Sequence, residues 1–267
     1  MKRLLIPLIA LMMMAQMAQG QVLISLIFGD KLNSPTLKFG LDGGANFSTL
    51  SNTGGSKYTS GFDLGFYFDF LLKKDKPWYI HTGVLVKSPL GADRLAPYHL
   101  TNADSASLDS LFADGGVNRK LRYFNVPVLA RYKFKIDLFV EAGVMLGLLY
   151  KAYDEFYTDI DNKQDLTFQN KVIDLYKRID VGGMAGLGYH FSKGTGTDIG
   201  IRYYYGFMDI LKDNPNAALR NSAFYLYIAI PIGAGEKAQA KQAARKKEKL
   251  EKQQQKLKEE QMNKEKK

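Results

Sequence analysis

The sequence predicts an all-β protein: an eight-stranded antiparallel up-and-down transmembrane β-barrel followed by a charged helical tail. Three observations predict this class. Eight segments alternate apolar and polar residues, the connections between them alternate in length, and the apolar side chains are too bulky for the inside of so small a barrel. After the first 20 residues, no stretch reaches the roughly 18 consecutive apolar residues of a membrane-spanning helix. Any membrane crossing is therefore expected through strands.

Each predicted strand has one apolar and one polar face. In the first strand the odd positions, from Leu37 to Phe47, are mostly apolar, while the even positions, from Lys38 to Asn46, are polar or glycine. This is the period of a β-strand. The same alternation marks residues 62–72, 78–86, 124–134, 138–150, 179–191, 199–207 and 224–232. Strands of about ten residues cross a bilayer when they are tilted.

The connections are alternately long and short. They cover residues 48–61, 73–77, 88–121, 135–137, 151–178, 192–197 and 208–222. A barrel whose first strand starts in the periplasm has this arrangement, with tight periplasmic turns and longer extracellular loops. We therefore expect the barrel (36–233) in a bacterial outer membrane, the long loops outside the cell, and both termini in the periplasm, including an N-terminal segment over 21–35.

The main structural alternative is a soluble barrel of lipocalin type, with the apolar faces turned inward. The interior of eight strands is just wide enough for side chains to fill it, and the apolar faces are too bulky for that space. The polar faces are rich in glycine, which suits a narrow interior. We therefore expect lipid-facing aromatic residues in two girdles at the membrane interfaces. The periplasmic girdle is Phe39, Phe70, Trp78, Tyr132, Phe134, Tyr189 and Phe191, and the other is Phe47, Phe62, Phe124, Tyr150, Tyr205, Phe207 and Phe224.

The formal net charge of +10 belongs mainly to the two ends of the chain. Residues 236–267 hold 12 basic and 6 acidic residues without glycine, proline or an aromatic residue, which predicts a basic helical tail over 234–267. Lys2 and Arg3, an apolar stretch and then Ala18-Gln19-Gly20 predict a signal peptide over 1–20. Export and a nearly neutral barrel argue against a nucleic-acid partner, and the lack of cysteine excludes disulfides and thiol chemistry.

Charged residues in the middle of the polar faces are expected inside the barrel. Buried charges must pair or keep water, so we expect a polar network that closes the lumen. Its predicted members are Asp63, Asp69, His81, Arg131, Glu141, Asp180 and Arg202. A turn near Lys135 would place residue 131 opposite residue 139, so that Arg131 lies diagonally from Glu141, within reach of an ion pair.

One segment carries a family resemblance. The residues YFNVPVLARYKF, from Tyr123 to Phe134, resemble a hairpin of the PorT-like outer-membrane β-barrel family, and Gln21 to Ser48 resembles the start of those proteins. The resemblance extends over residues 21–232 and implies a bacterial outer-membrane location. A founding member of the family is associated with protein secretion, and the family has no assigned catalytic residues to carry over. The charged tail is a departure, because many outer-membrane barrels end at an aromatic residue.

The expected function is non-enzymatic: a structural, anchoring or secretion-accessory role in the outer membrane. The expected partners are outer-membrane lipid and a periplasmic or secretion-complex protein that binds residues 236–267; no cofactor or metal is expected. The first alternative is a small solute channel or transporter. The second is a hydrolase on the rim of the barrel, built on His99 with Asp93, Asp104 and Ser105 nearby, although no G-x-S-x-G motif is present.

Overall fold

The computed structural model describes residues 36–72, 76–100, 110–160, 164–192, 196–212 and 218–232. Its strands are β1 (Leu37–Leu50), β2 (Thr59–Leu71), β3 (Trp78–Leu95), β4 (Gly116–Lys133), β5 (Leu138–Ile160), β6 (Gln164–Lys171), β7 (Ile179–His190), β8 (Asp198–Gly206) and β9 (Asn221–Pro231), with a short 3-10 helix, η1 (Ile173–Leu175). The predicted signal peptide, the segment 21–35 and the tail over 234–267 lie outside the described residues. Within the described ranges, no helix is long and apolar enough to cross a membrane.

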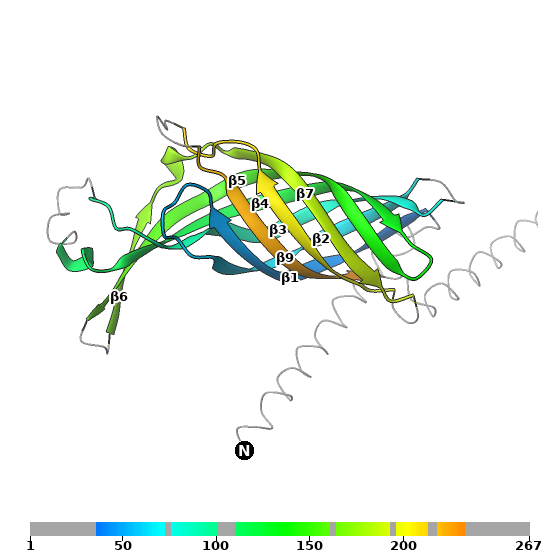
Figure 1. Ribbon diagram of the computed structural model, residues 1–267, viewed down its shortest axis with the longest axis horizontal. Helices are drawn as coiled ribbons and strands as arrows, with labels where there is room; N and C mark the ends of the chain where they lie inside the picture. The colour runs from blue at the N-terminus through cyan, green and yellow to red at the C-terminus, as the bar shows by residue number, and fades with distance from the viewer. Residues whose placement is uncertain are drawn as a thin grey trace, which may run out of the picture.

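Eight of the strands close into a ring (Figure 1). Each is antiparallel to its neighbours in the order β1-β2-β3-β4-β5-β7-β8-β9, and β9 pairs back with β1. The predicted eight-stranded antiparallel barrel is therefore confirmed. We call the end with the β2–β3, β4–β5 and β7–β8 connections the turn end, and the opposite end the loop end. Because β1 begins and β9 finishes at the turn end, the chain enters and leaves the barrel on one side.

The pairing register determines the tilt of the strands. Starting from Phe47, paired residues can be followed around the ring back to β1, where the path arrives at Leu37, a stagger of ten residues. The path runs through Phe224, Tyr203, Ala185, Ala142, Ala130, Ile80 and Phe70. Ten residues at about 3.3 Å each, across eight strands about 4.8 Å apart, tilt the strands by about 40°. This tilt lies within the range of membrane barrels.

Two of the predicted long loops contain substantial stretches of strand. Residues 88–121 contain the end of β3 and the start of β4, and residues 151–178 contain the end of β5, all of β6 and η1. β6 pairs only with the outer part of β5, over Tyr153–Ile160, so it lies outside the ring. This β5–β6 hairpin projects beyond the barrel at the loop end (Figure 1). The expectation of loops here was wrong because strand pairing continues past the membrane-crossing part of the ring.

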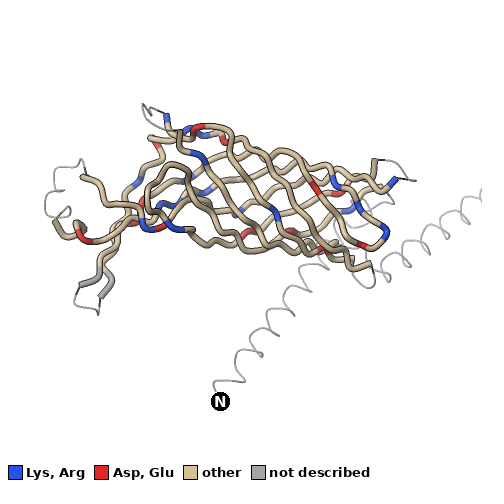
Figure 2. The backbone as a smooth tube through the Cα atoms, in the orientation of Figure 1, with Lys and Arg blue, Asp and Glu red and all other residues tan. Residues whose placement is uncertain are grey.

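The apolar faces of the ring point outward. Burial alternates at every residue of β8, and outward side chains such as Ile201 and Leu226 are each 52% exposed. Charged residues lie mainly towards the two ends of the barrel (Figure 2). Inward glycines make room for large interior rings: a Cβ on Gly188 would lie 2.4 Å from Phe139 Cζ, and one on Gly200 would lie 2.7 Å from Tyr227 Cε1. The wall therefore suits lipid, and the lipocalin-type alternative is wrong.

Candidate functional site

The β4–β5 turn places the first pair of charges. Phe134 N donates to Leu138 O (2.7 Å) around a three-residue loop, and Asp137 closes that loop in the left-handed region with φ of 64°. This geometry puts Arg131 directly opposite Glu141. The predicted register, with residue 131 opposite residue 139, was wrong by two residues because the turn is centred on residue 136 and not on Lys135. The predicted ion pair forms across directly facing positions.

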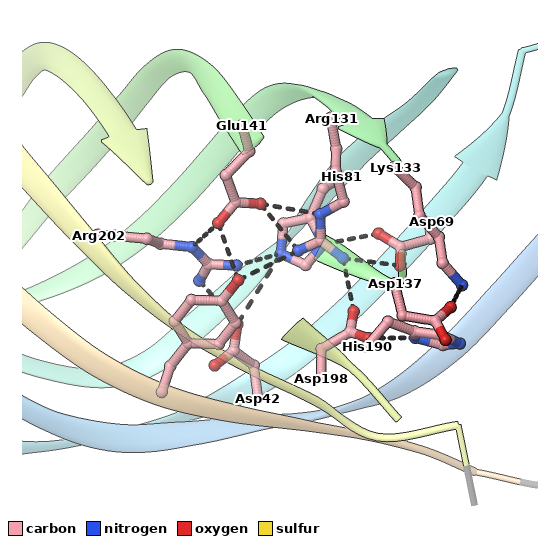
Figure 3. Close-up of polar contacts among 11 residues, drawn as sticks. Asp42, Asp69, His81, Arg131, Lys133, Asp137, Glu141, His190, Asp198 and Arg202 are labelled. Carbon is pink, nitrogen blue, oxygen red and sulfur yellow. Dashed lines mark hydrogen bonds and ion pairs between the residues drawn. The ribbon is translucent and has the colours of Figure 1, made fainter. Parts of the chain in front are cut away.

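Eight charged or titratable side chains meet in the half of the barrel nearest the turn end (Figure 3). All are buried, and we call them the charged cluster: Asp42, Asp69, His81, Arg131, Glu141, His190, Asp198 and Arg202. They come from seven of the eight ring strands. The cluster therefore connects strands that are not neighbours in the wall.

Arg131 is one centre of the charged cluster. Its Nε donates to Glu141 Oε2 (2.9 Å), and its Nη1 donates to Asp198 Oδ2 (2.7 Å) and Asp69 Oδ2 (3.2 Å). The guanidinium carbon also lies 4.3 Å from the centre of the Phe139 ring. One planar cation thus binds carboxylates from β2, β5 and β8, which suits the fork geometry of arginine.

Arg202 is the second centre, and its contacts determine the protonation of His81. Arg202 Nε donates to Glu141 Oε1 (2.6 Å) and its Nη1 donates to Asp42 Oδ2 (3.0 Å). Its Nη2 lies 2.9 Å from His81 Nε2. Because a guanidinium only donates, His81 Nε2 must accept, and the ring proton is on Nδ1, which donates to Asp69 Oδ1 (2.6 Å). His81 is therefore neutral in this arrangement.

The charged cluster has more carboxylates than guanidiniums, four against two. His190 Nδ1 forms a hydrogen bond with Asp198 Oδ1. A small cavity of about 20 Å³ lies beside this pair at the turn end, and Lys38 and Lys133 are among its lining residues. These two lysines supply positive charge where the carboxylates are in excess. The cavity has room for about one water molecule.

Two of the predicted network residues lie apart from the charged cluster. Asp63 accepts a hydrogen bond from Asn46 Nδ2 (2.9 Å). Asp180 accepts hydrogen bonds from Tyr204 OH (3.0 Å) and Asn221 Nδ2 (2.8 Å). Among the described residues, neither carboxyl has a cation within ion-pair distance. The structure therefore brings together Asp69, His81, Arg131, Glu141 and Arg202 of the predicted set and leaves Asp63 and Asp180 in separate neutral surroundings.

The half of the interior nearest the loop end contains a hydrophobic core beside the buried polar groups around Asp63 and Asp180. Leu129, Met145 and Met184 belong to a buried hydrophobic cluster that also includes Leu121, Leu149 and Tyr176. η1 adds Ile173 to this cluster. The interior is therefore less uniformly polar than expected: the charged cluster fills the turn half, and the loop half combines a packed hydrophobic core with a few buried polar side chains.

The predicted network leaves out four of its members: Asp42, His190, Asp198 and Tyr227. Tyr227 OH donates to Glu141 Oε1 (2.9 Å), and its ring lies 3.5 Å from the Arg202 guanidinium carbon. Asp42 and Tyr227 are on the polar faces of their strands, which is the signal that marks them. Asp198 immediately precedes the predicted strand 199–207, so its inward position depends on the actual start of β8.

The predicted rim site does not assemble in the part of the chain that is described. Asp104 and Ser105 lie outside the described residues, and Asp93 forms an ion pair with Lys120 (2.8 Å). His99 lines a cavity of about 230 Å³ together with Tyr98, Phe112 and Phe156. Burial, and next the Asp154 carboxylate, raise the pKa of the Tyr98 hydroxyl to about 12, so it remains a donor to Asp154 Oδ2 (2.9 Å). No group of three or more His, Asp or Glu side chains suited to a metal occurs in the described ranges.

Most of the predicted interface aromatics are exposed on the outer wall. All but two are exposed, Trp78 and Phe224 among them. Tyr132 is half-buried, with its ring 5.0 Å from Trp78. Phe39 is only 7% exposed because its ring packs against Phe66 and Phe68. Phe39 therefore differs from the prediction of a lipid-exposed ring.

A closed antiparallel ring with an apolar outer wall and buried charges inside defines the class of protein: a transmembrane β-barrel. The family named "Outer membrane protein beta-barrel domain" matches residues 17–212, and the chain belongs to this family. It is therefore a bacterial outer-membrane protein. Among curated proteins, no sequence matches the chain significantly.

Several solved structures are similar to the chain at low identity. The attachment invasion locus protein Ail of Yersinia pestis, solved with the heparin analogue sucrose octasulfate, is 11% identical over 73% of this chain and 99% of Ail, with a TM-score of 0.37. Neisserial surface protein A is 16% identical over 72% of this chain and 96% of its own, with a TM-score of 0.33. OprG of Pseudomonas aeruginosa is 12% identical over 74% of this chain and 96% of its own, with a TM-score of 0.33. At these values the three structures carry no argument about function.

Proposed function

We propose that the chain is a non-conducting, non-enzymatic outer-membrane barrel with a structural, anchoring or secretion-accessory role. The observation that carries this proposal is the filled interior: the charged cluster occupies the turn half, and the hydrophobic core around Leu129, Met145 and Met184 occupies the loop half. Solute passage would require both to move. An eight-stranded ring has little interior volume beyond that of its side chains.

Conductance measurements test this proposal against the alternative of a small channel. Full-length protein in planar lipid bilayers should give no current above that of a protein-free bilayer. An unrelated porin reconstituted in the same bilayers serves as the positive control for a pore. Discrete openings of the wild-type protein would support the channel and overturn the closed barrel.

We further propose that the loop end faces the cell exterior and that both termini lie in the periplasm. The short turns and the long connections support this orientation. The chain has no cysteine, so one introduced cysteine is a unique label. In intact cells, a membrane-impermeant maleimide should label Thr167→Cys on β6 and leave Ile136→Cys in the β4–β5 turn unlabelled. Labelling of Ile136→Cys and not of Thr167→Cys would show that the barrel has the opposite orientation.

The proposed partner contacts are at opposite ends. The projecting sheet of β3 to β6 presents a paired surface at the loop end, and residues 236–267 add a basic arm that suits an acidic periplasmic partner. The resemblance to the PorT-like family favours a secretion complex as that partner. Crosslinking in intact cells, with and without residues 236–267, tests this. A partner captured equally by both forms would rule out a role for the tail.

A further inference from the structure

Three cationic side chains stand together on the outer wall of the barrel. Lys87 is on β3, Arg122 on β4 and Lys151 on β5, three consecutive strands of the ring, and all three are exposed. Arg122 and Lys151 are directly paired in the β4–β5 ladder, and Ser88, next to Lys87, is paired with Tyr123, next to Arg122. We call these three residues the basic patch.

Two β-bulges turn the lysines outward. In β3 the register shifts between Leu85 and Ser88, so that Val86 and Lys87 are both exposed. In β5 the register shifts where Tyr123 pairs with Leu149 and Arg122 pairs with Lys151, so that Tyr150 and Lys151 are both exposed. A bulge inserts one residue and re-aims the next side chain. Without the bulge in β3, strict alternation from the inward Leu85 would point Lys87 into the barrel, and without the bulge in β5 alternation from the inward Leu149 would do the same to Lys151.

The basic patch has aromatic neighbours but no carboxylate partner among the described residues. Lys87 Nζ lies 5.5 Å from the Phe62 ring centre, and Lys151 Nζ lies 5.0 Å from that of Tyr153. Arg122 lies over the same Tyr153 ring at 5.5 Å and donates from Nη2 to its hydroxyl (3.1 Å).

The nearby acidic residues do not neutralise these cations. Asp154 accepts hydrogen bonds from Arg119 at 2.8 and 2.6 Å. Asp93 is paired with Lys120, and Glu155 lies four residues beyond Lys151 along β5. The charge of the basic patch is therefore available to a ligand.

The position of the basic patch is at the boundary of the apolar wall. Phe124 and Tyr150 stack next to it, with ring centres 4.5 Å apart, and both are members of the predicted girdle at the loop end. Exposed Leu148, Leu146 and Val144 continue the wall from Tyr150 towards the turn end. Cations next to interfacial rings lie at the depth of lipid headgroups.

We propose that Lys87, Arg122 and Lys151 form a binding site for the phosphate of an anionic lipid headgroup in the membrane leaflet at the loop end. The planar guanidinium of Arg122 matches two phosphate oxygens, and the two lysines supply point charges on either side of it. The acyl chains of the same lipid would lie along the wall below Phe124 and Tyr150. This site does not depend on which side of the membrane the loop end faces.

The test uses full-length protein in phosphatidylcholine nanodiscs that contain increasing fractions of lipopolysaccharide or of phosphatidylglycerol. Bound lipid is counted by native mass spectrometry. Wild-type protein should retain at least one of these anionic lipids selectively over phosphatidylcholine. The variant K87Q/R122Q/K151Q should bind that lipid on the order of a hundredfold more weakly, from the loss of three cations at the membrane surface.

Matched controls separate this site from general charge effects. The variant K76Q/K135Q/K212Q removes three exposed lysines elsewhere and should retain the lipid as wild type does. R122K keeps the charge but loses the planar fork, so it should bind with intermediate strength. All variants must first show the heat-dependent gel mobility of a folded barrel.

Three results would overturn the proposal. Equal retention of anionic lipid by the wild-type and patch variants would remove the site. An equal loss of lipid binding in the control variant would show that binding depends only on the net charge of the protein. Displacement of the lipid by inorganic phosphate at an equal concentration would make the ligand a soluble anion and not a lipid.

Discussion

At the scale of single residues, Arg131 is the cation of the charged cluster that binds the most carboxylates. It binds Asp69, Glu141 and Asp198, and all four side chains are buried. A buried ion pair adds little net stability when it is complete, because both ions lose their hydration, but removal of one partner leaves an unpaired buried charge. The structural importance of Arg131 is therefore that its loss would leave buried carboxylates without the cation that they share.

We expect Arg131→Met to lower the free energy of unfolding by about 3–5 kcal/mol. Urea unfolding can be followed through the fluorescence of Trp78, the single tryptophan of the chain. Lys135→Gln, on an exposed turn, is the control and should change stability by less than about 0.5 kcal/mol. A change of similar size in both variants would contradict the role of the charged cluster.

Asp63 and Asp69 lie on the same strand and should respond oppositely to the same chemical change. Asp69 is held by Arg131 and His81, whereas Asp63 accepts from the neutral amide of Asn46. Asp69→Asn should therefore destabilise the barrel by about 2–4 kcal/mol. Asp63→Asn should be neutral or stabilising, because it removes a buried carboxyl without a cationic partner. Equal losses in the two urea midpoints would refute this distinction.

At the scale of the elements, the β4–β5 turn determines the register on which the charged cluster depends. Asp137 has a φ of 64°, and its carboxylate accepts a hydrogen bond from Ser192 Oγ (2.7 Å) in the next turn. That hydrogen bond holds the pKa of Asp137 below its usual value. Asparagine can adopt this backbone conformation, whereas a β-branched residue is strained in it.

We expect Asp137→Val to cost about 1–2 kcal/mol and Asp137→Asn to cost clearly less. Both variants lose the carboxylate, but asparagine keeps an oxygen that can accept from Ser192 Oγ, so Ser192→Ala measures the share of that hydrogen bond. The measurement is the urea midpoint of each variant. Equal losses in Asp137→Val and Asp137→Asn would contradict a role for the backbone conformation.

β6 is the one described strand that the ring does not need. Replacement of residues 158–166 by Asn-Gly would join Tyr157 to Thr167, which already face each other, through a two-residue turn. All eight ring pairings remain, so the shortened protein should keep its heat-dependent gel mobility and lose less than about 1 kcal/mol of stability. Failure to form a barrel would mean that this hairpin is part of the folding unit.

The alternation of apolar and polar residues predicted the ring strands because lipid on one side and a packed lumen on the other impose a period of two. Beyond the membrane that constraint ends: Arg119 and Asp154, for example, pair at the loop end on extensions of β4 and β5 that the pattern did not detect. Arg131 and Glu141 were predictable because they share a hairpin. The partners of Asp42 and Asp198 were not predictable, because closure of the ring brings them together from distant strands.

At the scale of the whole molecule, ring closure leaves no unpaired strand edge in the membrane-spanning wall. Unpaired backbone groups are costly in lipid, and closure satisfies them all at once. The interior is then filled by the charged cluster near the turn end and by a hydrophobic core with a few buried polar side chains near the loop end. Together they explain why an open pore is not expected.

The charged cluster also affects the rate at which the barrel unfolds. Arg202 on β8 binds Asp42 on β1, 160 residues away in the sequence, and Arg131 on β4 binds Asp198 on β8. These bonds cannot form until the last strands have joined the first, so they should be absent from the transition state for folding. Loss of Arg202 in Arg202→Met should then leave the folding rate nearly unchanged and accelerate unfolding by at least about a hundredfold. The charged cluster would then slow unfolding without affecting folding, and so determine how long the inserted barrel stays folded.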